Sequence, residues 1–286
     1  MKISIIVAVY GVEKYIARCA NSLFNQTLDD IEYIFVNDCT LDKSMEVLQS
    51  VIEKFPHRKP YIKIINNNTN YGVGYTKQKG ILLATSEYFT VCDPDDYLDA
   101  DYYESLYKKA KESPADIVWC DIALTKNDSL RIYSQEMIEN NVECIKKICG
   151  LKGSWSLCNK LFSKKLLQHT DIMSTYNYQT AEDLVLCIKL FYYAQKVVYC
   201  PQVYYRYDVR EGSVTRSESK RIERSVSQKK AVEELEEFFA NKKDYKVFRG
   251  SIIAVRMYFN IRKILPQMPQ RIIKCLIQIR KCFIFN

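Results

Sequence analysis

Three carboxylates stand within four residues in the segment Asp93-Pro94-Asp95-Asp96. The preceding run, Tyr88 to Cys92, is short, apolar and β-branched, which is typical of a buried strand. Pro94 has a fixed φ and no N–H, so the strand must end there and display the acids. Like charges this close repel one another unless a cation lies between them, and Mg²⁺ and Mn²⁺ prefer carboxylate oxygens. Two interpretations stay open, a divalent-cation site and a solvated acidic turn before the next helix.

Strands and helices alternate along the first 120 residues, and this alternation must position the acids. The expected strands cover 2–10, 31–36, 62–65, 88–92 and 116–120, and the expected helices cover about 12–23, 42–55, 73–84 and 101–111. The pattern predicts an α/β fold with a mostly parallel, twisted sheet and helices on both faces. The loops that follow parallel strands share one edge, so we expect Tyr10, Asp38 and the acidic segment to converge.

A second acidic pair, Glu182-Asp183, precedes apolar residues at helical spacing. Acids are favoured in the first turn of a helix, and Thr180 is a candidate N-cap. A positioned carboxylate can also act as a general base. Both roles are compatible with the pattern.

Composition excludes several classes of protein. The chain has 286 residues, 48% of them hydrophobic and 27% charged, as in an ordinary globular protein. It has neither a G-x-G-x-x-G nor a P-loop motif, and its two histidines, His57 and His169, do not favour a zinc site. Eleven cysteines without C-x₂-C spacing indicate a reducing compartment. We expect no targeting segment before the first strand and no membrane span.

Basic charge is concentrated in the C-terminal quarter. Residues 219–286 contain 16 Lys and Arg against 6 Asp and Glu, whereas residues 1–218 contain 26 against 28. Arg271, Lys274, Gln278 and Lys281 share one face of an expected helix whose other positions are apolar. Such a helix can bind an anionic membrane surface or pack on the rest of the protein. No nucleic-acid motif accompanies the charge, so we expect no nucleic-acid partner.

Six segments resemble motifs of the family 2 glycosyltransferases, in the family's order. They are Ser4–Gly11 (against SIIVPVYN), Ile34–Ser44 (IVDDGSTDGS), Asn70–Gly80 (NxGxxxARNxG), Asp93–Asp96 (DxDD), Trp155–Leu161 (WxxxNKL) and Ala181–Asp183 (ED). The resemblance covers roughly residues 1–215, so the expected organisation is a GT-A catalytic domain at 1–215 and a basic, mainly helical extension at 216–286.

The resemblance implies inverting transfer of a hexose or N-acetylhexosamine from a nucleotide-diphosphate sugar, with UDP-sugar favoured and Mn²⁺ or Mg²⁺ as cofactor. The implied acceptor is a saccharide or a lipid-linked saccharide in surface polysaccharide synthesis. The cysteine content favours a cytoplasmic location, and the basic C-terminal helix favours peripheral contact at the inner face of the cytoplasmic membrane.

The resemblance also implies a donor side to the site. The backbone of Val9 and Tyr10 would line the base pocket, and Asp38 would accept a hydrogen bond from the base. Asp93 would lie near the ribose, and Lys77 would contact the donor as a point charge where the family commonly has arginine. Ala8 and Gly11 depart from the family's proline and asparagine, which predicts a looser first loop. Cys39 and Leu41 depart from the usual residues after Asp38.

The reacting groups and the acceptor side follow from the same resemblance. Asp95, with Asp93, would ligate the metal. Asp183 would be the general base, with Glu182 beside it. Residues implied on the acceptor side, or near phosphate, are Trp155, Arg206 and Arg210.

Two other functions remain open on the sequence. A nucleotidyltransferase would have a glycine-rich, basic first loop, which the segment after Tyr10 lacks. A catalytically inactive nucleotide-sugar-binding subunit would not need Asp38, Asp93, Asp95 and Asp183 together. Donor turnover distinguishes these alternatives.

Overall fold

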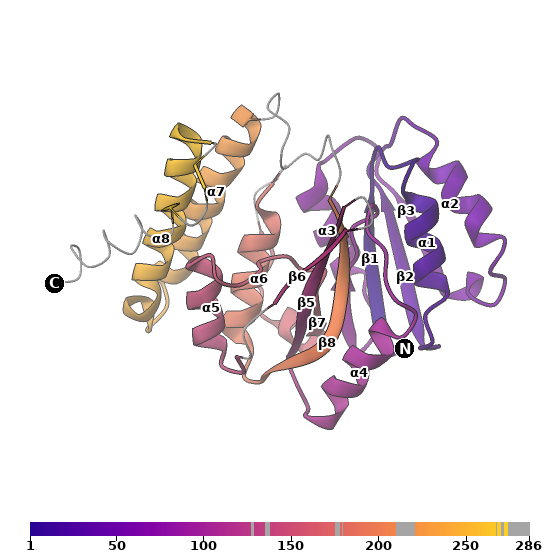
Figure 1. Cartoon of the computed structure of the whole chain (residues 1–286), viewed down its shortest axis with the longest axis horizontal. Coiled ribbons are helices and arrows are strands. Elements are labelled where there is room, and N and C mark those ends of the chain that lie inside the picture. The colour runs from indigo at the N-terminus through magenta and orange to yellow at the C-terminus, as the bar shows by residue number, and fades with distance from the viewer. Residues whose placement is uncertain are drawn as a thin grey trace.

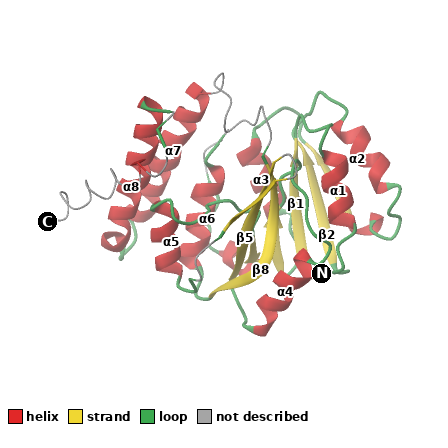
Figure 2. Ribbon diagram, in the orientation of Figure 1, coloured by secondary structure: helices red, strands yellow, loops and turns green. Residues whose placement is uncertain are grey.

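The computed structural model describes residues 1–126, 129–134, 138–174, 178, 180–209, 221–266, 268–269 and 272–273. A single eight-stranded sheet forms the centre of this part of the chain (Figures 1 and 2). The strands are β1 (Ile3–Val9), β2 (Ile31–Asn37), β3 (Ile62–Asn66), β4 (Tyr88–Val91), β5 (Ile117–Lys126), β6 (Ser129–Tyr133), β7 (Lys160–Ser163) and β8 (Val197–Asp208). The strand order is β3-β2-β1-β4-β7-β5-β6, and β8 also pairs with β5.

The sheet is mixed in strand direction. β3, β2, β1 and β4 are mutually parallel, as the sequence predicts, and β8 is parallel to β5. β7 is antiparallel to both β4 and β5, and β6 is antiparallel to β5. The sheet is therefore parallel where β1, β2 and β4 end side by side, and antiparallel pairing begins beyond β4.

Helices cover both faces of the sheet, as predicted. They are α1 (Ile16–Phe24), α2 (Ser44–Ile52), α3 (Val73–Leu82), α4 (Tyr102–Glu112), α5 (Asn141–Cys149), α6 (Glu182–Tyr193), α7 (Arg221–Ala240) and α8 (Tyr245–Ile264). Alternate side chains of β1 point to opposite faces. Ile5 and Val7 join the core under α1, α2 and α4. Ile6 joins the core under α3 and α5–α8.

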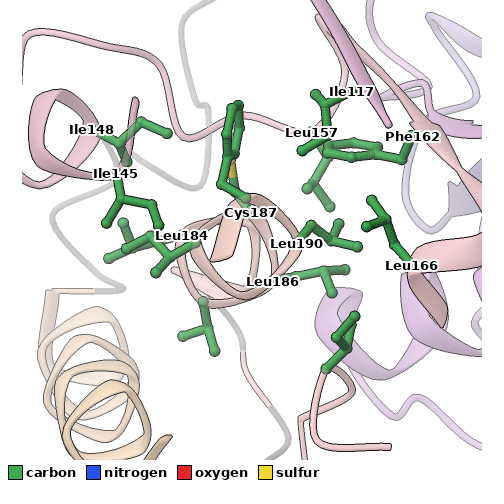
Figure 3. Close-up of a cluster of buried hydrophobic side chains, with 14 of the residues drawn as sticks. Ile117, Ile145, Ile148, Leu157, Phe162, Leu166, Leu184, Leu186, Cys187 and Leu190 are labelled. Carbon is green, nitrogen blue, oxygen red and sulfur yellow. The ribbon is translucent and has the colours of Figure 1, made fainter. Parts of the chain in front are cut away.

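Helix α6 is buried on all sides. Figure 3 shows it along its axis, with Ile145 and Ile148 of α5 on one side and Phe162 of β7 on the other. Its residues from Leu184 to Phe191 are all buried. A helix that is apolar around most of its circumference belongs inside a protein. The acidic pair that begins α6 is therefore carried by a rigid core element.

The C-terminal helices share this core. Leu235 and Phe239 of α7 and Phe248 of α8 belong to the same buried cluster as Ile6. The buried Lys189 ammonium of α6 lies 2.5 Å from the Glu234 carboxylate of α7, joining the two helices. The expected boundary at 215/216 falls within 210–220, outside the described residues.

A buried carboxylate fixes the register of the sheet. Ser4 of β1 pairs with Glu32 of β2, and the Ser4 hydroxyl donates to Glu32 at 2.5 Å. Lys63 of β3 and Thr85 also donate to Glu32. Burial raises the pKa of Glu32, but these hydrogen bonds outweigh burial and hold it below its usual value. Glu32 thus connects β1, β2, β3 and the segment before β4.

The described cysteines serve mostly as small buried side chains. Those described are all free thiols, and all but Cys39 are buried. Within the described ranges, we find no helix with the length and apolar character needed to cross a membrane.

Candidate functional site

The loops after β1, β2 and β4 lie at one edge of the sheet. β1 pairs in parallel with both β2 and β4, so Tyr10, Asp38 and Asp93 follow three adjacent strand ends. The Asp38 N–H donates to the Val9 carbonyl at 3.0 Å, which extends the β1–β2 pairing past the strands. Val9 is buried, whereas the Tyr10 side chain is 48% exposed. The expected convergence of these loops is present.

The three acids of the acidic segment have different environments. Asp93 and Asp95 are partly exposed, whereas Asp96 is buried. One Asp96 oxygen accepts from the Asp208 N–H at 2.9 Å, and the other has no partner. Burial, followed by the charges of Asp93 and Asp95, raises the pKa of Asp96 well above its usual value. Asp96 therefore supports the loop, and the other two acids remain accessible to a ligand.

Lys77 of α3 joins the two acidic motifs. Its ammonium lies 3.2 Å from Asp93, 3.0 Å from Glu182 and 2.9 Å from Asp183. The Lys77 side chain is only 5% exposed. Burial lowers the pKa of Lys77, but the charges of Asp183, Asp93 and Glu182 outweigh burial and raise it well above its usual value. One ammonium thus connects carboxylates that are about 90 residues apart in sequence.

Asp183 combines burial with an ion pair. One of its oxygens accepts from Lys77 and the other from the Leu157 N–H at 3.3 Å. Burial is the largest influence and raises the pKa of Asp183, although Lys77 lowers it. A carboxylate whose pKa is raised is a stronger base than an ordinary aspartate.

The N-cap expected at Thr180 is wrong. α6 begins at Glu182, and Ala181 precedes it with a left-handed φ of 71°. The Thr180 hydroxyl is buried and has no hydrogen-bond partner. Both acids stand in the first turn, as expected, where the helix dipole stabilises negative charge.

Asp38 holds the loop between β3 and α3. It is 3% exposed and accepts hydrogen bonds from the Asn67 amide and from the N–H groups of Tyr71 and Gly72, at 2.8–2.9 Å. Gly72 has a φ of 88°, a conformation that favours glycine. Asp38 therefore fixes the start of α3, the helix that carries Lys77. Its contact with a nucleotide base remains a prediction.

Hydrogen bonds connect the loop after β1 to the loop after β2. The N–H groups of Gly11, Val12 and Glu13 donate to the side chains of Thr40, Ser44 and Asp42 at 2.9–3.0 Å. These bonds restrain the backbone at the position where Ala8 and Gly11 led us to expect a looser loop. Burial raises the pKa of Asp42, but hydrogen bonds led by those of Ser44 and Thr40 bring it to about 2.

Two of the three residues expected on the acceptor side make contacts outside the Lys77 cluster. Trp155 packs on Tyr258 and Phe259 of α8, with ring centroids 6.2 and 6.5 Å away. Arg206 donates two hydrogen bonds of 2.8 Å to Asp99, a bidentate pair that occupies its guanidinium. Arg210 lies outside the described residues. Acceptor or phosphate contact by these three residues stays a prediction.

Two residues that support the acidic segment were not foreseen. Tyr205 of β8 accepts the Asp93 N–H at 3.1 Å, and Arg18 of α1 donates to the Asp95 carbonyl at 2.8 Å. Alternation along β8 could have indicated Tyr205, because it faces the opposite side from Arg206. Arg18 carries no comparable signal, since its position at the loop depends on how α1 packs.

The site's charge fits a divalent cation. Lys77 contacts the carboxylates of Asp93, Glu182 and Asp183. Asp95, two residues after Asp93, adds a fourth negative charge. The single Lys77 ammonium therefore compensates only part of the negative charge of the site. Among the described residues, no three His, Cys, Asp or Glu side chains form a metal-binding group by themselves. Mg²⁺-type sites commonly use one or two carboxylates and complete their coordination with substrate phosphates and water. Asp93 and Asp95 suit that kind of site.

Comparison with known sequences gives a consistent family. The family model described as glycosyl transferase family 2 matches residues 4–171. The uncharacterized glycosyltransferase EpsJ of Bacillus subtilis is 29% identical over 74% of this chain and 62% of its own. Glycosyltransferase GlyA of Streptococcus pneumoniae is 30% identical over 75% of this chain and 32% of its own. The poly(ribitol-phosphate) beta-glucosyltransferase of Bacillus spizizenii is 29% identical over 73% of this chain and 32% of its own. The chain thus spans less than two thirds of each relative.

Solved structures share the fold. TarS 1–349 of Staphylococcus aureus matches 91% of this chain with a TM-score of 0.70 and 20% identity, covering 72% of TarS 1–349. The same protein has been solved in complex with UDP-GlcNAc. A mannosyltransferase from Pyrobaculum calidifontis, in complex with GDP-Man and Mn²⁺, matches 92% of this chain and 70% of its own with a TM-score of 0.60 and 13% identity.

Proposed function

The chain belongs to glycosyltransferase family 2, and from that membership we propose that it transfers a sugar from a nucleotide-diphosphate donor to a saccharide hydroxyl with inversion. One observation supports this most directly. Lys77 brings Asp93 of the acidic segment and Asp183 of the later acidic pair to a single ammonium, at 3.2 and 2.9 Å. The two motifs that the reaction needs therefore belong to one site.

On the donor side, the loops after β1, β2 and β4 would bind the nucleotide. Val9 and Tyr10 would line the base, and Asp38 would contribute either directly or by holding Tyr71 and Gly72 in place. Asp93 and Asp95 would hold Mn²⁺ or Mg²⁺, which supplies charge stabilisation to the leaving diphosphate when bound. A UDP-sugar is the preferred donor in this proposal, with a hexose or N-acetylhexosamine as the sugar.

On the acceptor side, Asp183 would take the proton from the attacking hydroxyl at its carboxylate oxygen. Burial makes this carboxylate more basic than an exposed aspartate. Leu157 and Lys77 hold both of its oxygens in a fixed orientation, which a general base requires. Glu182 would share Lys77 and so limit how strongly that cation suppresses the basicity of Asp183.

The proposed acceptor is a saccharide or a lipid-linked saccharide of a surface polysaccharide. The basic C-terminal quarter supports peripheral contact with an anionic membrane at its inner, cytoplasmic face, because Lys and Arg gain about 1 kcal/mol each near such a surface. Arg271 and Lys274, the cations of the helix expected to make this contact, lie outside the described residues.

Two substitutions test the roles separately. In Asp183→Asn we expect donor binding to persist while transfer falls by at least about 10²-fold, because the general base is lost. In Asp95→Ala we expect the Mn²⁺-dependent part of donor binding to disappear. Thermal stabilisation by UDP-, GDP-, dTDP- and CMP-sugars, with and without Mn²⁺, measures binding. Release of the nucleotide from the donor, with a saccharide acceptor present, measures transfer.

Asp99→Ala is a suitable control, because this acid follows the same segment but pairs with Arg206. It should retain metal-dependent binding. Transfer at the parental rate in Asp183→Asn would require another base. Donor binding without turnover in the parent protein would favour the inactive-subunit alternative.

A further inference from the structure

An exposed apolar surface lies where α7 begins and α8 ends. Ile222 is 80% exposed, Val226 51%, Ile264 73% and Leu265 48%. Ile222 and Val226 are four residues apart and share one face of α7. The Arg221 guanidinium of α7 donates to the Lys263 carbonyl of α8 at 2.8 Å, so the two helix ends are adjacent. We call these four apolar residues the helix-end surface.

A basic groove adjoins the helix-end surface. It lies between α7 and α8, has a volume of about 600 Å³, and is lined by Val226 and Phe259 together with Lys229, Arg256 and Lys263. Two acids partly offset these cations: Glu233 lies 3.5 Å from Lys229, and Glu236 pairs with Arg256. Lys229 remains 78% exposed and Arg256 50%.

The combination of apolar side chains and cations is suited to an anionic lipid bilayer. An anionic bilayer offers phosphate groups for the lysines and arginines and an apolar layer beneath them for isoleucine and leucine. A second copy of this chain bound through the same surface would place like charges opposite one another, which opposes a symmetric dimer.

The helix-end surface lies at the same end of the molecule as the candidate site. β8 ends at Asp208, whose N–H bonds to Asp96 of the acidic segment. Figures 1 and 2 show the start of α7 and the end of α8 at the top of the view, toward which β1 and β8 also run. A flat surface that touches this end would face the edge where the donor loops meet.

We propose that the helix-end surface and its basic groove dock the protein on anionic phospholipid, with the donor edge turned toward the membrane. This inference rests on the proposed transfer to a membrane-linked acceptor and adds the residues and the orientation. In that orientation, an acceptor anchored in the bilayer meets the site without leaving the membrane.

Vesicle sedimentation with the full chain tests the surface. We expect the parent protein to bind vesicles of phosphatidylcholine with about 30 mol% phosphatidylglycerol at least about tenfold more strongly than phosphatidylcholine alone. The pair Ile222→Glu and Ile264→Glu should reduce that binding about tenfold or more, because it places charge in the apolar layer. Val247→Glu is the matched control, since Val247 is 46% exposed at the other end of α8, beside Lys246.

The outcomes separate the inference from the proposed function. Equal loss in the Val247 variant, no loss in the double variant, or no vesicle binding by the parent would overturn the docking surface. Conversion of a parental dimer to a monomer by the double variant would also overturn it. Donor-dependent thermal stabilisation of the same samples reports on the transfer proposal independently.

A second experiment tests the same surface through a fluorescence signal at the membrane, whereas sedimentation tests it through a loss of vesicle binding. Ile264→Trp and Val247→Trp each add one indole at an exposed position. Lipids brominated in their acyl chains should quench the added fluorescence of Ile264→Trp and leave that of Val247→Trp unchanged. Quenching of Val247→Trp alone, or of neither variant, would contradict the orientation.

Discussion

At the scale of single residues, Lys77 balances the charge of the candidate site. Replacing it with methionine leaves Asp93, Glu182 and Asp183 facing one another without their shared cation. We expect Lys77→Met to lose about 3 kcal/mol of unfolding free energy, as when one partner of a buried ion pair is removed. Added Mn²⁺ should restore more stability to this variant than to the parent, because the carboxylates then lack any other cation.

Chemical unfolding with and without Mn²⁺ measures both effects. Lys79→Met is the control, since Lys79 lies on the same helix and donates to the Asn67 amide rather than to a carboxylate. A loss in Lys77→Met no larger than in Lys79→Met would mean that the ion-pair cluster contributes little.

Asp42 should contribute stability that depends on pH. Its pKa of about 2 in the folded protein lies below the usual 3.8, so the folded state holds the proton less tightly than the unfolded chain. The contribution is therefore complete above pH 3.8 and is lost as the pH falls toward 2. Because the Asp42 carboxyl is close to solvent, screening limits this contribution to less than about 1 kcal/mol at neutral pH.

Urea unfolding of Asp42→Asn and the parent checks this pH dependence. The difference in unfolding free energy should shrink between pH 6 and pH 3. Asp101→Asn serves as the control, because Asp101 makes no side-chain cap bond at the start of α4. A difference that stays constant with pH would contradict the role assigned to the Asp42 hydrogen bonds.

At the scale of elements, α3 is positioned by its close approach to the sheet. A Cβ added at Gly80 would lie 2.5 Å from Ile6 Cγ2 and 3.2 Å from Val36 Cγ2. Alanine favours a helix by up to about 1 kcal/mol over glycine, but overpacking costs about 1–3 kcal/mol. We expect Gly80→Ala to lower stability and to weaken donor binding, because α3 carries Lys77.

A double-mutant cycle with Ile6→Ala tests the cause. The combined variant should lose less unfolding free energy than the sum of the single variants, since removing the Ile6 side chain makes room for the new methyl group. Simple additivity would assign the effect of Gly80→Ala to something other than this contact.

Strands in the first half of the chain could be predicted, and the later strands could not. The strands near 3–9, 31–37 and 62–66 carry regular apolar patterns, and the structure places them within a residue or two. β7 and β8 were not among the expected strands, because long-range pairing with β5 decides them. The acidic segment was recognisable from composition alone, whereas Arg18 reaches it only through the packing of α1.

At the scale of the whole molecule, the C-terminal helices and the catalytic part form one core. Glu234 of α7 accepts hydrogen bonds from Lys189 of α6, from Ser174 and from Tyr178. The Tyr178 carbonyl in turn accepts the Gly74 N–H of α3 at 3.2 Å. The last helices are thus connected to both helices that carry the site's charged residues.

Glu234→Gln should therefore destabilise the entire protein. The change leaves the buried Lys189 ammonium without its counter-ion, and we expect a loss of about 3 kcal/mol. Glu236→Gln, two residues further along α7, breaks a partly exposed pair with Arg256 and should cost less than about 1 kcal/mol. Both variants should unfold in a single transition. Separate transitions for the two parts would contradict the shared core.

Glu32 has a consequence at the opposite edge of the sheet. It lies six residues before Asp38, which directly follows β2, and pairs with Ser4, six residues before Tyr10. Strand residues repeat every 3.2–3.4 Å, so a slip of one position would shift Asp38 by that length relative to Tyr10 and turn Glu32 toward the other face. The Glu32 carboxylate, about 20 Å from the donor loops, therefore fixes the alignment of Asp38 with Tyr10. The correct strand pairing is selected during folding, before a ligand binds.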